Sequence, residues 1–241
     1  MRVGIVTVAF NEPDFIVPCI KQFEGFGFPH IVLISKSPWR GNYSQDNTWV
    51  LARMHNAYGE TFIDHWPDQA TQINFGLEIL QREGIEWALF VDVDEFYTST
   101  DIGRLIGHIR NTNADAITCP NMFVYWKTPE YLLIPHQNDN PIIAIKTNQK
   151  FINKRDFIGT KTNSDVEMHH MSYVRTDEQM KKKIETFEHS HEFNTEQWYN
   201  DVWIPWTLDN VNLHPTIPTK FNRAIVHPAP MIIRKLINWD S

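Results

Sequence analysis

The chain has 241 residues, a formal net charge of −7 and an isoelectric point of about 5.9. This length suits one globular domain with a sizeable core, and 42% hydrophobic and 21% charged residues are typical of an ordinary folded protein. No long Lys or Arg stripe occurs, which argues against nucleic-acid binding dominated by charge but leaves room for a local basic groove.

The sequence also bears on the cellular setting. The two cysteines, Cys19 and Cys119, lie in apolar stretches, so reduced, buried thiols are expected rather than a disulfide. The N-terminal segment lacks the pattern of a signal peptide, and no apolar run has the length that spans a bilayer. These features predict a cytoplasmic protein without a transmembrane segment, and peripheral association with a membrane stays open.

The first half of the chain alternates strand-like and helix-like patterns. Short apolar runs rich in β-branched residues predict buried strands at 3–10, 30–35, 61–64 and 87–91. Apolar residues at helical spacing predict helices that begin after Asn11-Glu12, at 46–58, at 68–83 and around 102–109. This order predicts an α/β fold with a mostly parallel central sheet and helices on both faces.

The second half is less regular. Strands are expected at 116–119, 122–126, 142–146 and 150–152. Helices are expected at 176–187, where Thr176 and Gln179 form a capping box, and at 196–206, whereas 214–230 reads as irregular. Without a repeat or a linker, the simplest description is a single domain, 1–241, with a regular half (1–100) and a variable half (101–241).

Three carboxylates follow the strand expected at 87–91, in the run Asp92-Val93-Asp94-Glu95. Like charges this close repel each other, and a hard divalent cation with oxygen ligands would offset the repulsion. Positions 92 and 94 of an extended chain point the same way, so one can hold a metal while the other reaches a sugar or ribose hydroxyl. The alternative is a solvated acidic turn, because Asp-x-Asp alone is a weak motif.

These residues resemble the GT-A glycosyltransferases, in particular their family 2-like group. In that group one early strand ends in Asn-Glu, as in Asn11-Glu12, and a later one ends in Asp-x-Asp-Glu followed by an aromatic residue, as in 92–96. Further elements are similar to those of a bacterial and viral subgroup: Ser37-Pro38-Trp39-Arg40-Gly41, Asp46-Asn47-Thr48, Trp66 and Gln72-Ile73-Asn74. In the subgroup an Arg usually stands where this chain has Ile73, which removes one candidate phosphate contact. The resemblance covers 1–100 well and is thinner afterwards.

The resemblance implies a GT-A type fold in which the half 1–100 binds the nucleotide-sugar at the carboxyl ends of the strands and the half 101–241 binds the acceptor. It assigns a sugar or ribose contact to Asp92, and nucleotide contacts to Thr7, Ala9, Asn11, Glu12, Ser35 and Asp46. Helix capping is an alternative role for Glu12, and a plain loop position is the alternative for Asp46.

The resemblance also implies a bound Mn²⁺ or Mg²⁺, held by Asp94 and a downstream histidine. His169 and His170 would face opposite ways on a strand, and the likeness of His170-Met171-Ser172-Tyr173 to family 2-like and family 17-like enzymes favours His170. An ordinary buried histidine is the alternative. Lys183 or Arg175 is expected to neutralise the diphosphate leaving group.

An inverting enzyme needs a general base for the acceptor hydroxyl. Asp165 and Glu167 are the candidates and Glu130 is a third, although each is equally a surface carboxylate and a retaining mechanism stays open. Four tryptophans are candidates for stacking on an acceptor, against core packing as the alternative: Trp126, Trp198, Trp203 and Trp206.

The expected activity is therefore transfer of a sugar from a nucleotide-diphosphate donor, UDP rather than GDP, to an acceptor hydroxyl. Glycan, lipid-linked, protein and modified-DNA acceptors are all compatible with the sequence. One alternative is a nucleotidyltransferase, which would usually carry a Gly-rich basic loop after the first strand. Another is a non-catalytic sugar-binding or scaffold protein that kept the fold.

Overall fold

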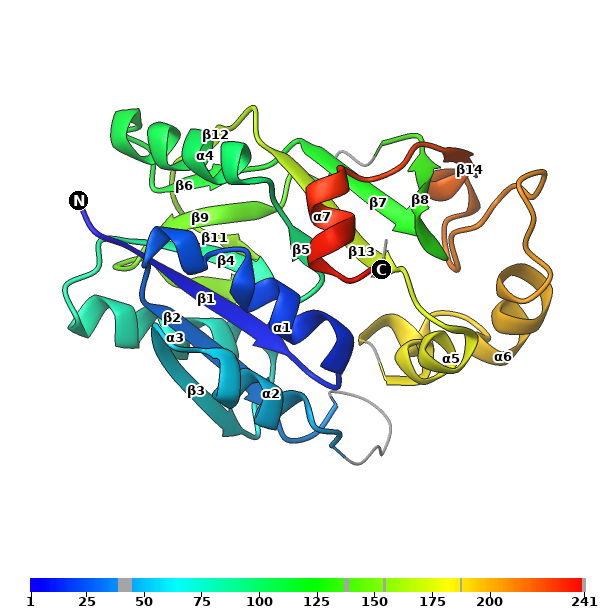
Figure 1. Ribbon diagram of the computed structural model, residues 1–241, viewed down its shortest axis with the longest axis horizontal. Helices are drawn as coiled ribbons and strands as arrows, with labels where there is room; N and C mark the ends of the chain where they lie inside the picture. Colours follow the sequence, from blue (N-terminus) through cyan, green and yellow to red (C-terminus); the bar gives the residue numbers. More distant parts are fainter. Residues whose placement is uncertain (39–44, 137–138, 154, 187, 240–241) are drawn as a thin grey trace.

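The structure is a computed structural model that describes residues 1–239 except 39–44, 137–138, 154 and 187. Its main sheet has the order β12-β6-β9-β4-β1-β2-β3 (Figure 1). The strands are β1 (Val3–Ala9), β2 (His30–Ser35), β3 (Gly59–Asp64), β4 (Trp87–Asp92), β6 (Ala116–Thr118), β9 (Ile142–Lys146) and β12 (Lys161–Asn163). Neighbours are parallel except where β9 runs antiparallel to β4 and β6. The prediction of a mostly parallel sheet is confirmed.

Helices cover both faces of this sheet, as predicted. They are α1 (Pro13–Lys21), α2 (Thr48–His55), α3 (Gln69–Arg82) and α4 (Ser99–Asn111). Strand side chains alternate between two hydrophobic clusters, so that Ile5 joins the cluster of α1 and α4 while Val6 joins that of α3. This two-sided burial explains why the strands read as continuous apolar runs.

A second sheet, of order β14-β8-β7-β13-β5, lies beside the first (Figure 1). Its strands are β5 (Glu95–Phe96), β7 (Asn121–Trp126), β8 (Thr128–Ile134), β13 (Glu167–Tyr173) and β14 (Arg223–Val226). Because β5 follows the acidic run directly and pairs with β13, this sheet joins the end of β4 to the second half of the chain.

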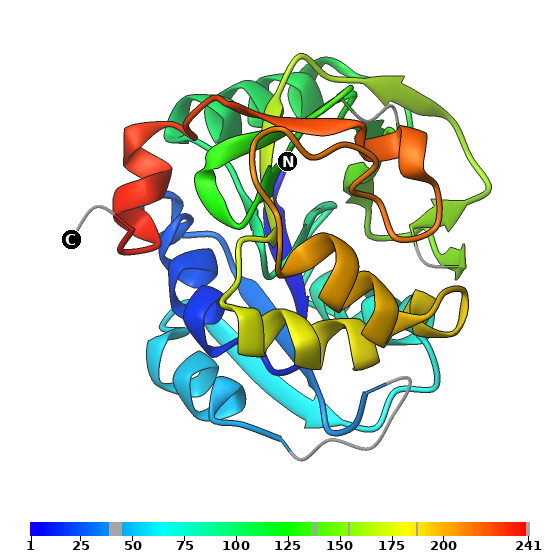
Figure 2. The same cartoon turned by 90° about the vertical axis from the view of Figure 1, so that its right-hand side faces the viewer.

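Helices α5 (Asp177–Thr186) and α6 (Thr195–Trp198) lie next to each other beyond β13, as Figure 2 shows, and α7 (Met231–Leu236) packs near α1. The remaining helical segments are a π-helical turn, Tyr199–Trp203, and the short 3-10 turns Glu24–Phe26, Glu188–His191 and Pro218–Phe221. None of the helices in the described part of the chain is both long and apolar enough to cross a bilayer.

A two-stranded hairpin, β10 (Phe151–Asn153) and β11 (Asp156–Phe157), packs against α3. The Asn74 side chain fixes it through two 2.8 Å hydrogen bonds, one from its amide to the Phe151 carbonyl and one from the Phe151 N–H to its oxygen. The hairpin turn presents Arg155 to the main sheet.

The second half differs from the sequence-based expectation in several places, and strands β11 and β12 and helix α7 were not predicted. Strand β14 lies inside the segment expected to be irregular, because Arg223–Val226 pairs antiparallel with β8. Strand β8 itself was not predicted. The helix expected at 196–206 is broken into α6 and the π-helical turn. The capping box of α5 forms as predicted, with reciprocal bonds between Thr176 and Gln179.

Candidate active site

A cavity of about 450 Å³ opens at the carboxyl ends of β1, β2 and β4. Ligands bind at this edge of open α/β sheets. Its lining brings together seven of the predicted site residues, Ala9, Glu12, Ser35, Asp92, Asp94, His170 and Lys183. A second cavity of about 490 Å³ shares Asp92 and His170 with the first and adds Glu95 and Arg155. A third, of about 460 Å³, shares Glu12 and Lys183 with the first and includes Asn11, Asp46 and Arg175.

Asp94 is buried at the centre of a cluster of basic side chains. Its Oδ2 accepts hydrogen bonds from Lys183 Nζ at 2.8 Å and from Arg175 Nη2 at 3.1 Å. Its Oδ1 lies 3.3 Å from His170 Nε2. Burial tends to raise the pKa of the Asp94 carboxyl, but Lys183, His170 and Arg175 outweigh burial and hold it well below its usual value. Asp94 is therefore ionised and can serve as a metal ligand.

Backbone pairing sets the distance between Asp94 and His170. Glu95 of β5 faces His170 of β13 in the antiparallel pair, and the Met171 N–H donates to the Asp94 carbonyl at 2.8 Å. Burial lowers the pKa of His170, but Asp94 more than offsets this and the net pKa is raised.

His169 faces the opposite way. Its Nδ1 lies 3.1 Å from the Tyr125 hydroxyl and its ring stacks on Phe123, while burial lowers its pKa to about 4. The structure thus places His170, and not His169, beside Asp94.

Asp94 and His170 suit a Mn²⁺ or Mg²⁺ ion. A carboxylate oxygen and a ring nitrogen 3.3 Å apart on one cavity are spaced as adjacent ligands of a single ion, and they leave positions for phosphate oxygens. Within the described ranges no group of three or more His, Cys, Asp or Glu side chains could hold a metal ion, so the protein offers a pair of ligands.

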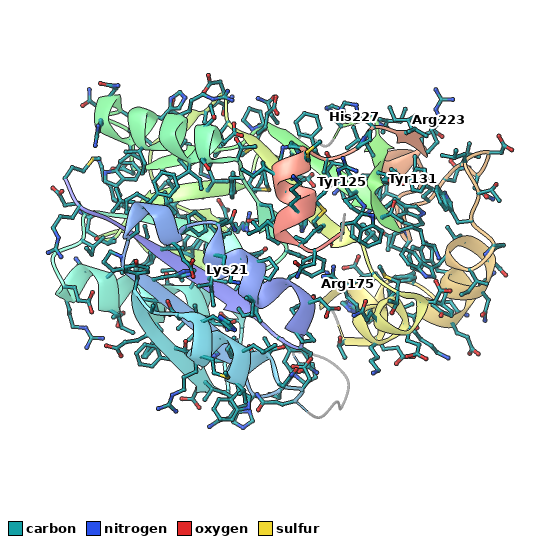
Figure 3. All side chains as sticks on the ribbon, in the orientation of Figure 1. Lys21, Tyr125, Tyr131, Arg175, Arg223 and His227 are labelled. Carbon is teal, nitrogen blue, oxygen red and sulfur yellow. The ribbon has the colours of Figure 1, made fainter. Side chains whose placement is uncertain are left out.

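Arg175 is buried and already engaged, with 3% of its side chain exposed. Its Nη2 donates to both Glu12 oxygens at 2.9 and 2.8 Å and to Asp94, and its Nη1 donates to the carbonyls of Met171 and Val174 at 2.7 and 2.9 Å. Its guanidinium also lies 4.2 Å from the ring centre of Phe15. Figure 3 shows it between α1 and α5. The expected role of Arg175 at a diphosphate stays a prediction: its contacts join Glu12 to Asp94 and it lines the third cavity, whereas Lys183 lines the main cavity.

Asp92 and Glu95 have a separate basic partner, Arg155. Its Nη2 lies 3.0 Å from Asp92 Oδ2 and 2.7 Å from Glu95 Oε1. The backbone N–H of Asp92 donates to Glu95 Oε2 at 3.0 Å. Burial lowers the pKa of Arg155, but the two carboxylates raise it above its usual value, whereas burial raises the pKa of Glu95 despite Arg155.

These contacts revise the electrostatic argument from the sequence. From the sequence, a divalent cation was expected to offset the repulsion within the run 92–95. In the structure Arg155, Arg175 and Lys183 offset it. The case for a metal therefore rests on the Asp94–His170 pair and not on uncompensated charge. Arg155 was missed because it lies in a polar turn whose local sequence carries no motif.

The predicted nucleotide side is built from interlocking loops. Asn11 has a positive φ of 52°, and its side-chain oxygen accepts from the Asp46 N–H at 3.1 Å. Asp46 in turn accepts from the N–H and hydroxyl of Thr48 at the start of α2. Glu12 makes no side-chain cap on α1, because its carboxylate pairs with Arg175 and Lys183. Trp39, Arg40 and Gly41 lie outside the described residues.

Thr7 does not reach the cavity and its assignment is corrected. On β1 it faces α1, fully buried, and its hydroxyl lies 2.9 Å from His30 Nε2. Ile73, at the position where the subgroup usually has an Arg, is buried in the core cluster that includes Val6 and Val8 of β1.

The two predicted general bases also lie away from the cavities. Asp165 Oδ1 is 2.6 Å from His108 Nε2 of α4, and Glu167 is exposed at the start of β13. A strand rises about 3.3 Å per residue, so Glu167 is roughly 10 Å from His170 along β13. Glu130 lies on β8 and is not among the residues that line the cavities described above. Nearness in sequence therefore did not bring these carboxylates to the site.

The tryptophans expected to stack on an acceptor form a core instead. The ring of Trp126 packs against Trp198, Trp203 and Trp206 at 5.0–6.4 Å. Trp126, Trp198 and Trp203 are buried, and Trp206 is half-buried.

The family model described as Glycosyl transferase family 2 matches residues 4–177. No curated protein matches the chain. Among solved structures, it is similar to the mannosyltransferase PcManGT from Pyrobaculum calidifontis with GDP-Man and Mn²⁺ (11% identity, 80% of this chain and 65% of that one, TM-score 0.49). It is also similar to S. aureus TarS with UDP-GlcNAc (12%, 76% and 64%, 0.48).

A third similar structure is glucosyl-3-phosphoglycerate synthase from Mycobacterium tuberculosis with Mn²⁺, UDP and glucosyl-3-phosphoglycerate (17%, 51% and 44%, TM-score 0.39). The chain thus spans less than two thirds of the length of each of these three proteins.

Proposed function

The chain belongs to glycosyl transferase family 2, and from that premise we propose that it moves a sugar from a UDP-sugar to an acceptor hydroxyl with the help of Mn²⁺ or Mg²⁺. The observation that carries the proposal is the Asp94–His170 pair, 3.3 Å apart on a cavity at the carboxyl edge of the sheet. Family membership makes the protein a nucleotide-sugar-dependent transferase; the ion and the uridine base are the proposed refinements.

Each side chain of the cavity has a role in this proposal. Asp94 Oδ1 and His170 Nε2 hold the divalent ion, which supplies positive charge to the diphosphate when it is bound. Lys183 lies beside Asp94 and turns its ammonium to the departing diphosphate. Asp92 accepts a hydrogen bond from a hydroxyl of the donor sugar or ribose. Glu12 and Asn11 shape the nucleotide end of the cavity.

An inverting reaction also needs a base, and we infer that it comes from the second cavity. Asp139 and Asp156 line that cavity, and each pairs with a lysine. Asp139 Oδ2 lies 2.8 Å from Lys220 Nζ, and Asp156 Oδ1 lies 3.0 Å from Lys161 Nζ. Changing each to Asn tests the assignment: the base variant loses transfer to the acceptor, and the other retains it.

The main test is a donor screen by thermal shift, with UDP, GDP and their sugars, in Mn²⁺ or in EDTA. We expect a metal-dependent shift with a uridine nucleotide and metal-dependent release of UDP from a UDP-sugar. Asp94→Asn removes the ionised ligand at constant size and should lower turnover by about 100-fold or more. Glu78→Gln on the outer surface of α3 is the matched control and should behave as the wild type. Full turnover in EDTA, or a full metal-dependent shift in Asp94→Asn, contradicts the metal assignment.

A further inference from the structure

The acidic run is divided between two separate sets of basic side chains. Asp94 contacts Arg175, Lys183 and His170, whereas Asp92 and Glu95 contact Arg155. The three basic partners of Asp94 come from β13 and the segment that follows it. Arg155 comes from the β10–β11 hairpin. We propose that Arg155 is a positioning residue, which fixes Asp92 for its contact with a hydroxyl of the donor sugar; the inference rests on the proposed function.

Asp92, Arg155 and Glu95 each contact the other two. Arg155 Nη2 lies within 3.0 Å of Asp92 Oδ2 and within 2.7 Å of Glu95 Oε1, and Glu95 Oε2 accepts the backbone N–H of Asp92. Both the side chain and the backbone of Asp92 are thus held by the same Arg–Glu pair. Oδ2 is held by Arg155, while for Oδ1 the described part of the chain shows one long contact, 3.5 Å from Gln69 Nε2 on the cavity side. One oxygen is fixed and the other is available to a ligand hydroxyl.

Arg155 is itself held in place from two sides. Its guanidinium lies 4.5 Å from the ring centre of Phe90 in β4, and 15% of its side chain is exposed. The two Asn74–Phe151 bonds fix the hairpin that carries it to α3. A lysine at this position would keep the charge but lose the flat stacking surface, so Arg155→Lys should restore only part of the function.

Because the two sets share no basic residue among these ion pairs, substitutions can separate them. Arg155→Gln disturbs Asp92 and leaves the contacts of Asp94 in place. A loss of positioning should therefore lower donor turnover while Mn²⁺ and UDP still bind. A general loss of structure would remove both. Thr147→Val is the control for stability alone, because Thr147 is buried at the opposite end of β4, where its hydroxyl donates to the Ile85 carbonyl at 2.6 Å.

The experiment measures three quantities on the full chain: the melting temperature, its shift with Mn²⁺ and UDP, and kcat and KM for release of UDP from a UDP-sugar. For Arg155→Gln we expect a wild-type shift with Mn²⁺ and UDP, and a kcat lower by about 30-fold or more with a smaller change in KM. Arg155→Lys should recover about a third of the lost activity on a logarithmic scale. Thr147→Val should melt at a lower temperature but keep its kcat.

A double-mutant cycle sharpens the test. If Arg155 acts through Asp92, the double variant of Arg155→Gln and Asp92→Asn should be no slower than the slower single variant. A double variant slowed by the product of the two single effects overturns the inference. So does Arg155→Gln with a kcat within about 3-fold of wild type, or with its Mn²⁺–UDP shift lost. In each of these cases the wild type still releases UDP from a UDP-sugar. Failure of the proposed function differs, because the wild type then releases no nucleotide from any donor, and this inference fails with it.

Discussion

Replacing Arg175 by Met should destabilise the protein before any ligand is added. The guanidinium is buried between Glu12 and Asp94, and Met removes its charge while keeping most of the length of the side chain. Glu12 then loses its closest basic partner and Asp94 loses one of its three, and the carbonyls of Met171 and Val174 lose a donor each. The destabilisation follows from buried groups left without partners and not from a change in volume.

The expected size follows from these contacts. Breaking a buried ion pair by removing one partner typically costs about 3–5 kcal/mol. Lys183 remains 2.8 Å from Asp94 and 3.6 Å from Glu12, so the lower end, about 3 kcal/mol, is expected. Arg175→Lys keeps the charge, but a single ammonium cannot reach both carboxylates and also donate to the carbonyls of Met171 and Val174. This substitution should destabilise the protein by about 2 kcal/mol.

Urea unfolding without metal or nucleotide measures the effect as a shift in midpoint at constant m-value. The double variant with Glu12→Gln should regain part of the loss, because one of the two carboxylates that Arg175 contacts becomes neutral. If Arg175→Met changed the free energy of unfolding by less than about 1 kcal/mol, below the range for broken buried pairs, the guanidinium would not be the structural link described here. A loss seen only when nucleotide is present would instead support the predicted role of Arg175 at the diphosphate.

Three further outcomes follow from the structure. Lys183→Gln should lower kcat by about 100-fold while Mn²⁺ binding persists, as measured by UDP release and thermal shift. Gly59→Ala should lower the melting temperature strongly, because a Cβ there would lie 1.9 Å from the His30 carbonyl oxygen, whereas Gly103→Ala, with open space around it, should not. Burial lowers the pKa of His30 to about 3, so the unfolded chain binds a proton that the folded chain does not. Stability should therefore fall as the pH drops from about 6.5 towards 3, by about 2 kcal/mol at pH 5, and urea titrations of His30→Gln should show a smaller loss.

Local sequence predicts those strands and helices whose buried residues form a regular apolar pattern along the chain. Strands β1, β2 and β4 are buried on both faces, and their unbroken apolar runs match the observed bounds within one or two residues. Strand β14 gave no such signal, because its four residues are extended through pairing with β8, far away in the sequence. Propensity over so short a segment is outweighed by tertiary contacts.

The site residues also differ in how far the sequence alone predicts them. Asp94 and Asp92 could be found because they end a recognisable strand, and His170 because it lies in a motif. Arg155 could not, since only the packing of the hairpin on α3 brings it to the acidic run. Asp165 was placed wrongly for the opposite reason: it is five positions from His170, but an extended chain carries it out of the site and onto α4.

Because β5 pairs with β13, the number of residues between 165 and 170 decides which residue of β13 lies opposite Glu95. Adjacent residues of β13 face opposite sides of the sheet, so deleting one residue before His170 while the backbone pairing is kept would bring Met171 opposite Glu95, and inserting one would bring His169 there. A histidine would then remain near Asp94 after an insertion but not after a deletion. Length changes in this short segment are thus unequal in effect, and a variant with one added residue would retain the histidine that a variant with one fewer loses.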